Sequence, residues 1–148
     1  MTSKEYKTVT YSVAIELPKS QKEVFDHLIN LKQWWPEKFE GDDIRLNSEF
    51  VLTTGDSHYS RNKVIELAPE KKLAWLVTDS VRRTDGYDWT GTKMIFELSP
   101  EGDNTLIKFT YDGVVLEDEY ERLVTICDLT LKEMFYQFII TGKGQSGD

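Results

Sequence analysis

Few residues in this sequence are of the types that hold metals or act as nucleophiles. The chain has two histidines, His27 and His58, and a single cysteine, Cys127. Their spacing is not that of zinc ligands, so we expect no metal site and interpret both histidines as surface or loop residues. The sequence also has no G-x-S-x-G elbow, glycine-rich phosphate loop or dinucleotide-binding fingerprint. We therefore predict no catalytic residue and no cofactor.

Two sets of reactive groups each allow two interpretations. Cys127 lies at an apolar position, where the simpler interpretation is a buried, inert thiol with a raised pKa. The alternative is a nucleophile or a ligand contact at the floor of a cavity. Asp79, Asp85 and Asp88 lie close to Trp89 in the sequence. A buried acid there could act as a general base, but turn formation is the simpler role for these aspartates.

The aromatic residues are the most informative set. The chain has four Trp, seven Tyr and seven Phe, more than a core of this size needs. Trp and Tyr combine apolar area with a polar group, which suits a cavity for an apolar or aromatic ligand. The same residues could instead fill a packed interior, and both interpretations stand. With the helix residues expected to face them, the predicted ligand-binding set is Trp34, Trp35, Phe50, Trp75, Tyr87, Trp89, Phe109, Tyr111, Cys127, Leu131 and Phe135.

Composition limits the classes of partner and compartment. The net charge of −8 in a chain of 148 residues argues against binding to nucleic acid or to an anionic membrane. No apolar run is long enough for a transmembrane helix, and the first residues lack the features of a signal peptide. A single cysteine fits the reducing cytoplasm. We expect one domain over residues 1–143 and a flexible tail over 144–148.

One long helix is predicted in the last third of the chain, from Leu116 to Thr141. Asp118 and Glu121 form a capping pair at its start, and Gly142 is placed to end it. Such a helix would be roughly 35–39 Å long, enough to form one wall of the core. Apolar residues three or four apart form a stripe about 120° wide: Leu116, Tyr120, Leu123, Val124, Cys127, Leu131, Met134, Phe135 and Phe138.

The upstream sequence is predicted to form strands and one short helical region. Thr8 to Leu17 alternates in period two, and Ser20 with Glu23 forms a capping box for a helix that buries Val24, Phe25 and Leu28. Residues 37–44 could be a loop or a short strand. Five more strands follow, separated by tight turns, which implies an antiparallel meander. The less regular alternation of the strand from Tyr59 to Leu67 suggests a bulge, and Asp112-Gly113 is expected to end the last strand. Alternation predicts these helix-facing residues: Val9, Tyr11, Val13, Ile15, Leu73, Trp75, Val77, Met94, Phe96, Leu98, Ile107, Phe109 and Tyr111.

The order of these elements resembles a known superfamily. It is similar to the Bet v 1-like, START-related (SRPBCC) proteins, and within them to the AHSA1 group, named for homology to the C-terminal domain of Hsp90 ATPase activators. The resemblance covers nearly the whole chain through the order and spacing of its motifs. They are Pro18, Glu23-Val24-Phe25, Trp34-Trp35, Val64-x-Glu66-x-x-Pro69, Leu73-x-Trp75, Phe96-x-Leu98-x-Pro100, Cys127 and Thr141-Gly142-Lys143-Gly144.

The resemblance implies an α+β helix-grip fold, in which a curved antiparallel sheet wraps a long C-terminal helix and two short helices follow the first strand. Members of the group often carry a Trp soon after the Cys, where this chain has Leu131 or Phe135, so the cavity shape is not carried over. The superfamily contains carriers, cyclases and chaperone partners on one scaffold. Three functions are therefore open.

The first is non-enzymatic binding of a small apolar or aromatic molecule between the sheet and the long helix. It rests on the aromatic set and on the missing catalytic machinery. The second is an enzyme of the polyketide-cyclase or hydratase type, using an Asp or Tyr in the cavity. The third is a chaperone-interacting module, as in the Hsp90 activators. An ionisable side chain beside open volume in the interior would favour the second over the first.

A second apolar stripe is predicted on the back of the long helix. Ile126, Leu129, Tyr136 and Ile140 fall at about 200–280° when Leu116 is at 0° and each residue adds 100°. That side should face solvent in a helix-grip domain. Scattered exposed apolar residues are ordinary, but a contiguous patch is unusual on a monomer. The hypothesis is a homodimer that sets this helix against its copy.

Overall fold

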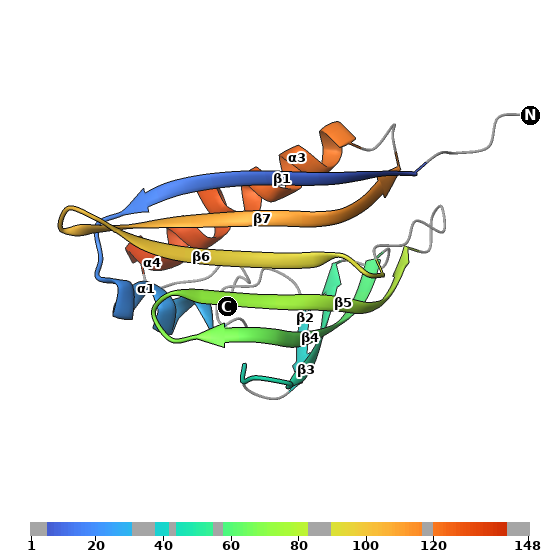
Figure 1. The fold of residues 1–148 in the computed structure, drawn as a ribbon, viewed down its shortest axis with the longest axis horizontal. Helices are drawn as coiled ribbons and strands as arrows, with labels where there is room; N and C mark the ends of the chain where they lie inside the picture. The colour runs from blue at the N-terminus through green and yellow to red at the C-terminus, as the bar shows by residue number, and fades with distance from the viewer. Residues whose placement is uncertain are drawn as a thin grey trace, which may run out of the picture.

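The structure is an antiparallel sheet gripping a helical rod. The computed structural model describes residues 6–30, 38–41, 44–54, 58–82, 90–116 and 120–141. The strands are β1 (Tyr6–Leu17), β2 (Lys38–Gly41), β3 (Glu49–Thr54), β4 (His58–Ala68), β5 (Lys72–Arg82), β6 (Lys93–Glu101) and β7 (Asn104–Leu116) (Figure 1). The helices are α1 (Gln21–Leu28), α3 (Tyr120–Leu129), the π-helical segment η2 (Thr130–Phe135) and α4 (Tyr136–Thr141).

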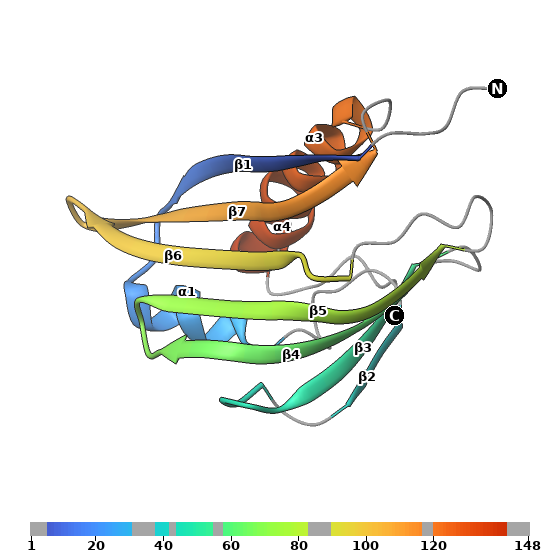
Figure 2. The ribbon, with the colours of Figure 1, turned by 45° about the vertical axis from the view of Figure 1, so that its right-hand side comes forward.

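This arrangement confirms the predicted α+β helix-grip fold. The strand order is β1-β7-β6-β5-β4-β3-β2, and every neighbouring pair is antiparallel. Figures 1 and 2 show the rod α3–η2–α4 on one side of the sheet, while β2 and β3 curve away from β1 and β7. Residues 31–37, between α1 and β2, lie outside the described residues, so the second short helix expected after the first strand stays a prediction.

The start of the chain forms as the sequence predicts. β1 alternates exposed residues with residues turned toward the rod, and Val13 and Leu17 are buried. Ser20 is the N-cap of α1, and its Oγ accepts a hydrogen bond from the Glu23 N–H at 3.2 Å. The apolar face of α1 is fully buried through Val24, Phe25 and Leu28.

Hydrogen bonds between connections fix α1 to one end of the sheet. Gln21 Nε2 donates to Glu70 O at 3.0 Å in the β4–β5 turn. The buried Thr105 at the start of β7 donates through its hydroxyl to Lys19 O at 2.8 Å, and Leu98 N–H donates to Lys71 O at 2.8 Å. The first bond joins α1 to the β4–β5 turn, the second joins the β1–α1 link to β7, and the third joins the β4–β5 turn to β6. Together they hold α1 across that end of the sheet.

Two irregularities interrupt the pairing of β4 with β5. The register shifts between Arg61 and Asn62 and again between Val64 and Glu66, which agrees with the bulge that the sequence suggested for this strand. Thr78 is the extra residue of the first shift, and its hydroxyl donates to Arg61 O at 3.2 Å. Bulges bend a strand and re-aim its side chains, and here they lie in the middle of the sheet.

β7 is longer than the sequence predicts. Asp112-Gly113 was expected to end this strand, but β7 continues to Leu116, and Gly113 pairs with Val9 of β1. The glycine is needed for close packing, because a methyl group at Gly113 would lie only 2.5 Å from Thr92 Oγ1. A Gly that normally signals a turn is therefore a place where a neighbouring strand approaches.

The predicted long helix is wrong at its start. Leu116 belongs to β7, and the helix begins at Tyr120 within the described residues. The expected caps at Asp118 and Gly142 lie outside the described residues. The buried face is otherwise as predicted, with Leu123, Cys127, Leu131, Phe135 and Phe138 each nearly inaccessible.

The π-helical segment changes which residues face the core after Phe135. Tyr136 N–H donates to Leu131 O, five residues back, in addition to Glu133 O. The wider turn rotates each residue by less than the α-helical step, so later residues lie earlier around the axis. Ile139 is buried as a result, and Tyr136, predicted on the solvent side, packs partly against the core.

The core between sheet and rod is built by the alternation of the strands. The residues of β5, β6 and β7 that belong to the buried apolar cluster are ones that parity selected, while Val9, Tyr11, Ile15 and Met94 are only partly buried against it. The buried members of the predicted sheet face are Val13, Leu73, Trp75, Val77, Phe96, Leu98, Ile107, Phe109 and Tyr111.

Replacing Phe109 with Ala should lower the free energy of unfolding by about 3–5 kcal/mol, because it leaves a cavity under the rod. The matched control is Lys108→Ala, on the exposed face of the same strand, which should change stability by less than about 0.5 kcal/mol. Chemical denaturation measures both. Equal losses at the two positions would contradict the assigned faces of β7.

Candidate functional site

An aromatic row crosses the concave face of the sheet. We use this name for Phe39 on β2, Phe50 on β3, Trp75 on β5, Phe96 on β6 and Phe109 on β7. Successive ring centroids are 5.6, 5.2, 5.3 and 4.6 Å apart, in stacked, T-shaped, tilted and stacked geometries. Such contacts are favourable beyond their buried area. The row is continuous except at β4, which contributes no ring.

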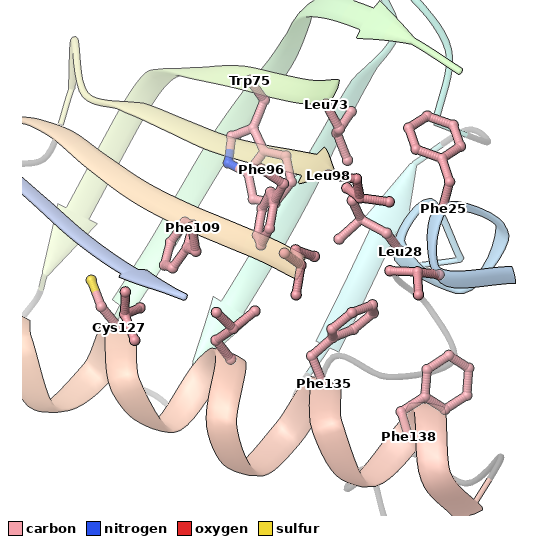
Figure 3. Close-up of a cluster of buried hydrophobic side chains, with 14 of the residues drawn as sticks. Phe25, Leu28, Leu73, Trp75, Phe96, Leu98, Phe109, Cys127, Phe135 and Phe138 are labelled. Carbon is pink, nitrogen blue, oxygen red and sulfur yellow. The ribbon is translucent and has the colours of Figure 1, made fainter. Parts of the chain in front are cut away.

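The rod covers this row with apolar side chains. Figure 3 shows Cys127 and Phe135 projecting from the rod toward the strands that carry Trp75, Phe96 and Phe109. At the α1 end of the rod, the His27 ring meets Phe138 edge-on at 5.1 Å. His27 is therefore partly buried, and not the plain surface residue expected from the sequence.

Seven of the eleven predicted ligand-binding residues come together here. They share one buried cluster, together with residues of α1. The four others, Trp34, Trp35, Tyr87 and Trp89, lie outside the described residues. The seven are Phe50, Trp75, Phe109, Tyr111, Cys127, Leu131 and Phe135.

Neutral polar groups are buried on the same face. Asn62 and Ser60 alternate with exposed Arg61 on β4, and Thr92 donates through Oγ1 to the Tyr111 hydroxyl at 3.3 Å. Of these, only Tyr111 was selected from the sequence. The missed signal was parity: Ser60 and Asn62 occupy the same alternate positions of their strand as the buried Val64.

Cys127 is a poor nucleophile in this environment. Burial, followed by the nearby Asp128 carboxylate, raises the pKa of the thiol to about 12. Since the thiolate is the reactive form, the side chain is almost wholly protonated at neutral pH. This supports the simpler interpretation, in which Cys127 is an inert part of the core.

A hydrogen bond ties β1 to the rod beside that cysteine. The Tyr11 hydroxyl donates to Asp128 Oδ1 at 2.8 Å in a partly buried setting. The hydrogen bond to Asp128, with burial next, raises the pKa of Tyr11 to about 12. The phenol is therefore a proton donor that stays protonated at neutral pH.

Asp79, one of the aspartates singled out in the sequence, does not enter the interior. Asp79 is exposed on β5, while Asp85 and Asp88 lie outside the described residues. Asp79 is therefore not the buried general base considered above. Among the described residues, no three His, Cys, Asp or Glu side chains are grouped as metal ligands.

The outer edge of the sheet has a shallow pocket of about 290 Å³. It is lined by residues of β2, β3 and β4, including the charged side chains of Glu40, Glu49 and Arg61. Gly41 lies at its base, close to the backbone of Phe50. Phe50 of the aromatic row also lines it, but most of its lining residues are exposed, so the hollow opens to solvent.

The Tyr11 bond should make stability depend on alkaline pH. Because the folded state holds the phenol proton more tightly than the ordinary pKa of 10.0 allows, its contribution is complete below about pH 10 and is lost as pH rises toward 12. Denaturation of wild type and Tyr11→Phe across this range should show the wild-type advantage shrinking. An advantage unchanged from pH 9 to 12 would contradict the assigned bond.

Comparisons with known proteins agree with the fold. The chain has a TM-score of 0.70 to the solution structure of the Aha1 dimer from Colwellia psychrerythraea, at 18% identity, covering 92% of this chain and 99% of that one. CalU16 from Micromonospora echinospora gives 0.65 at 14% identity, covering 95% and 84%.

A third similar structure is DynU16, a protein in the dynemicin biosynthetic locus. It gives a TM-score of 0.68 at 13% identity, covering 92% of this chain but 49% of that one, so this chain spans about half its length. At these identities the likeness shows the fold alone. No curated protein matches the chain in sequence. No helix in the described part of the chain is long and apolar enough to cross a membrane.

The sequence itself carries the family relationship. The profile described as activator of Hsp90 ATPase homolog 1-like protein (AHSA1) matches residues 20–138. That span runs from the N-cap of α1 to Phe138 of α4 and includes six of the seven strands. The chain belongs to the AHSA1 family.

Proposed function

We propose that this protein binds a small apolar or aromatic molecule between the concave face of the sheet and the rod α3–η2–α4. The observation that carries the proposal is the aromatic row, whose five rings form four successive contacts across the sheet face that the rod covers. Flat rings on one wall and aliphatic side chains on the other are the usual lining of a small-molecule site.

The character of the buried polar groups favours binding over acid–base chemistry. In the part of the chain that the structure describes, the buried polar groups of side chains are hydroxyls of Ser, Thr and Tyr, one Asn amide, the Trp75 indole N–H and the Cys127 thiol. Hydroxyls and amides orient a ligand through hydrogen bonds without changing their charge. General acid–base catalysis needs a group whose pKa lies near the working pH.

An enzyme of the cyclase type is the second candidate. DynU16 belongs to a biosynthetic locus, and the Tyr11–Asp128 pair places an ionisable couple between β1 and the rod. The raised pKa keeps the Tyr11 phenol protonated, and to assist a reaction the phenol would have to exchange its hydrogen bond to Asp128 for one to a substrate oxygen. Asp128→Asn would then alter the turnover of a substrate. In a protein that only binds its ligand, the same substitution would change only the hydrogen bond between Tyr11 and the rod.

Methylnaphthalene tests the binding proposal directly. Followed by proton–nitrogen correlation NMR, it should shift the amides of Phe96 and Phe109 and the Trp75 indole N–H saturably, and leave Thr10 on the opposite face unmoved. Leu131→Phe adds volume on the covering wall and should weaken binding by about tenfold.

Leu129→Phe is the matched control, because it makes the same change two residues away on the exposed side of the rod. Its affinity should equal that of wild type. Absence of any saturable shift, or equal weakening by both variants, would overturn the proposed site. Denaturation curves of both variants show that each is folded before the titrations are compared.

We further propose that the protein forms a homodimer through the solvent side of the rod. Leu129 and Ile140 there are 49% and 44% exposed, and the similar Aha1 from Colwellia psychrerythraea is described as a dimer. The patch is smaller than the sequence suggested, because Tyr136 packs partly on the core, and the side chain of Ile126 lies outside the described residues.

Sedimentation equilibrium at micromolar concentration should show a dimer for wild type and a monomer for Leu129→Glu/Ile140→Glu, since two buried charges oppose an apolar contact. Lys108→Glu is the control, because it changes a charge at an exposed position on the face of the sheet opposite the rod. It should remain dimeric. A monomeric wild type would remove this proposal without touching the ligand site.

A further inference from the structure

Three buried side chains on the concave face each have a donor or an acceptor without a hydrogen-bond partner among the described residues. The Trp75 side chain is 3% exposed, and its indole N–H has no acceptor among the described residues. The Asn62 side chain is 1% exposed, and within the described chain its Oδ1 accepts no hydrogen bond. Buried groups of this kind are normally bonded, so each exception needs an explanation.

The orientation of the Asn62 amide is fixed by its neighbour. Nδ2 donates to Ser60 O and to Ser60 Oγ, both at 3.3 Å. A backbone carbonyl can only accept, so the NH₂ group must face Ser60 and the carbonyl oxygen must face away from it. The 8% exposed Ser60 hydroxyl accepts from Asn62, and it donates to no residue that the structure describes.

Strand pairing places Asn62 and Trp75 near each other. Asn62 is paired with Phe50 on one side and Val77 on the other, while Trp75 is paired with Val64. Asn62 and Trp75 are therefore diagonal neighbours on adjacent strands, roughly 7–8 Å apart at their backbones and within reach of long side chains. Both side chains face the interior, since both are buried with the row.

Asn62 also lies on β4, the one strand between β2 and β7 that contributes no ring to the aromatic row. β4 lies between Phe50 and Trp75, whose rings are 5.2 Å apart, and it contributes Asn62 and Val64 to this face. The register shift next to Asn62 is the kind of irregularity that re-aims a side chain beside a site. Figure 3 shows the indole nitrogen of Trp75 within the apolar cluster that the rod covers.

We infer that Trp75 and Asn62 together recognise one hydroxyl group on the ligand. The hydroxyl oxygen accepts a hydrogen bond from Trp75 Nε1–H, and the hydroxyl proton is donated to Asn62 Oδ1. The ligand class is then a flat apolar molecule that carries an alcohol or phenol hydroxyl. This inference rests on the proposed ligand site and adds the polar group that selects within it.

Three naphthalenes substituted at the same ring position test the inference: naphthol, methylnaphthalene and methoxynaphthalene. Naphthol can both accept and donate, the methyl ether can only accept, and the methyl compound can do neither. Wild type should bind naphthol roughly three- to tenfold more tightly than methylnaphthalene, the gain expected for a hydrogen bond. Methoxynaphthalene should lie between them.

The Trp75 indole N–H resonance gives a second readout. Naphthol should move this resonance downfield in proton–nitrogen NMR, because its oxygen accepts from the N–H, whereas methylnaphthalene should produce only the smaller shift of a neighbouring ring. Trp75→Phe identifies the resonance by its loss. It keeps an aromatic ring in the row while removing the donor, so it serves also as a test variant.

Asn62→Leu and Trp75→Phe should each bring the ratio of naphthol to methylnaphthalene affinity close to one, whatever change either makes to the affinity for the apolar compound. The control is Thr110→Val, which removes a buried hydroxyl bonded to Ser12 at 2.8 Å on the opposite face of the sheet. It should keep the full preference. If Asn62→Leu does not fold, Trp75→Phe decides alone.

The outcomes separate this inference from the ligand site itself. Binding of all three compounds with equal affinity in wild type would overturn the hydroxyl recognition and leave the apolar site standing. Preference for naphthol that survives both substitutions would place the recognising groups elsewhere and overturn the inference. If none of the three compounds binds, both the ligand site and its hydroxyl recognition fail.

Discussion

The fold depends on covering the concave face of one sheet. β5, β6 and β7 each turn large apolar side chains to that face, and exposing them to water would cost far more than a domain's net stability. The rod α3–η2–α4 and the short α1 provide the apolar cover for this face within the described residues. Every other element is constrained by this packing, including the hydrogen bonds that hold α1 across the strand ends.

The strands could be predicted because period-two alternation is a local property. Phe96, Phe109 and Trp75 face the rod because their neighbours are polar or lie on the outer face. The end of β7 could not be predicted, because the role of Gly113 is set by Thr92, a residue brought beside it only by folding. From sequence alone a glycine favours a turn. In the structure Gly113 continues the strand, because the close approach of Thr92 leaves no room for a side chain.

In the rod, too, part of the burial pattern could be predicted from local sequence and part could not. Leu123, Cys127 and Leu131 follow a 3.6-residue period and are buried as that period predicts. After Phe135 the π-helical turn shifts the later residues around the axis. Tyr136, expected on the solvent side, consequently packs partly against the core, and Ile139 is buried. No sequence pattern marks the segment in advance.

At the site, the sequence predicted the aromatic residues but did not predict the buried polar residues. A row of rings follows from composition and parity, but Ser60 and Asn62 lie in a strand whose bulges obscure its alternation. An amide at the centre of an apolar face is costly unless something bonds it. If this face were only a packed core, Leu at position 62 would avoid the cost of burying an amide oxygen that has no hydrogen-bond partner. An Asn beside an unbonded indole N–H is therefore better explained by selection for a ligand's polar group than by stability.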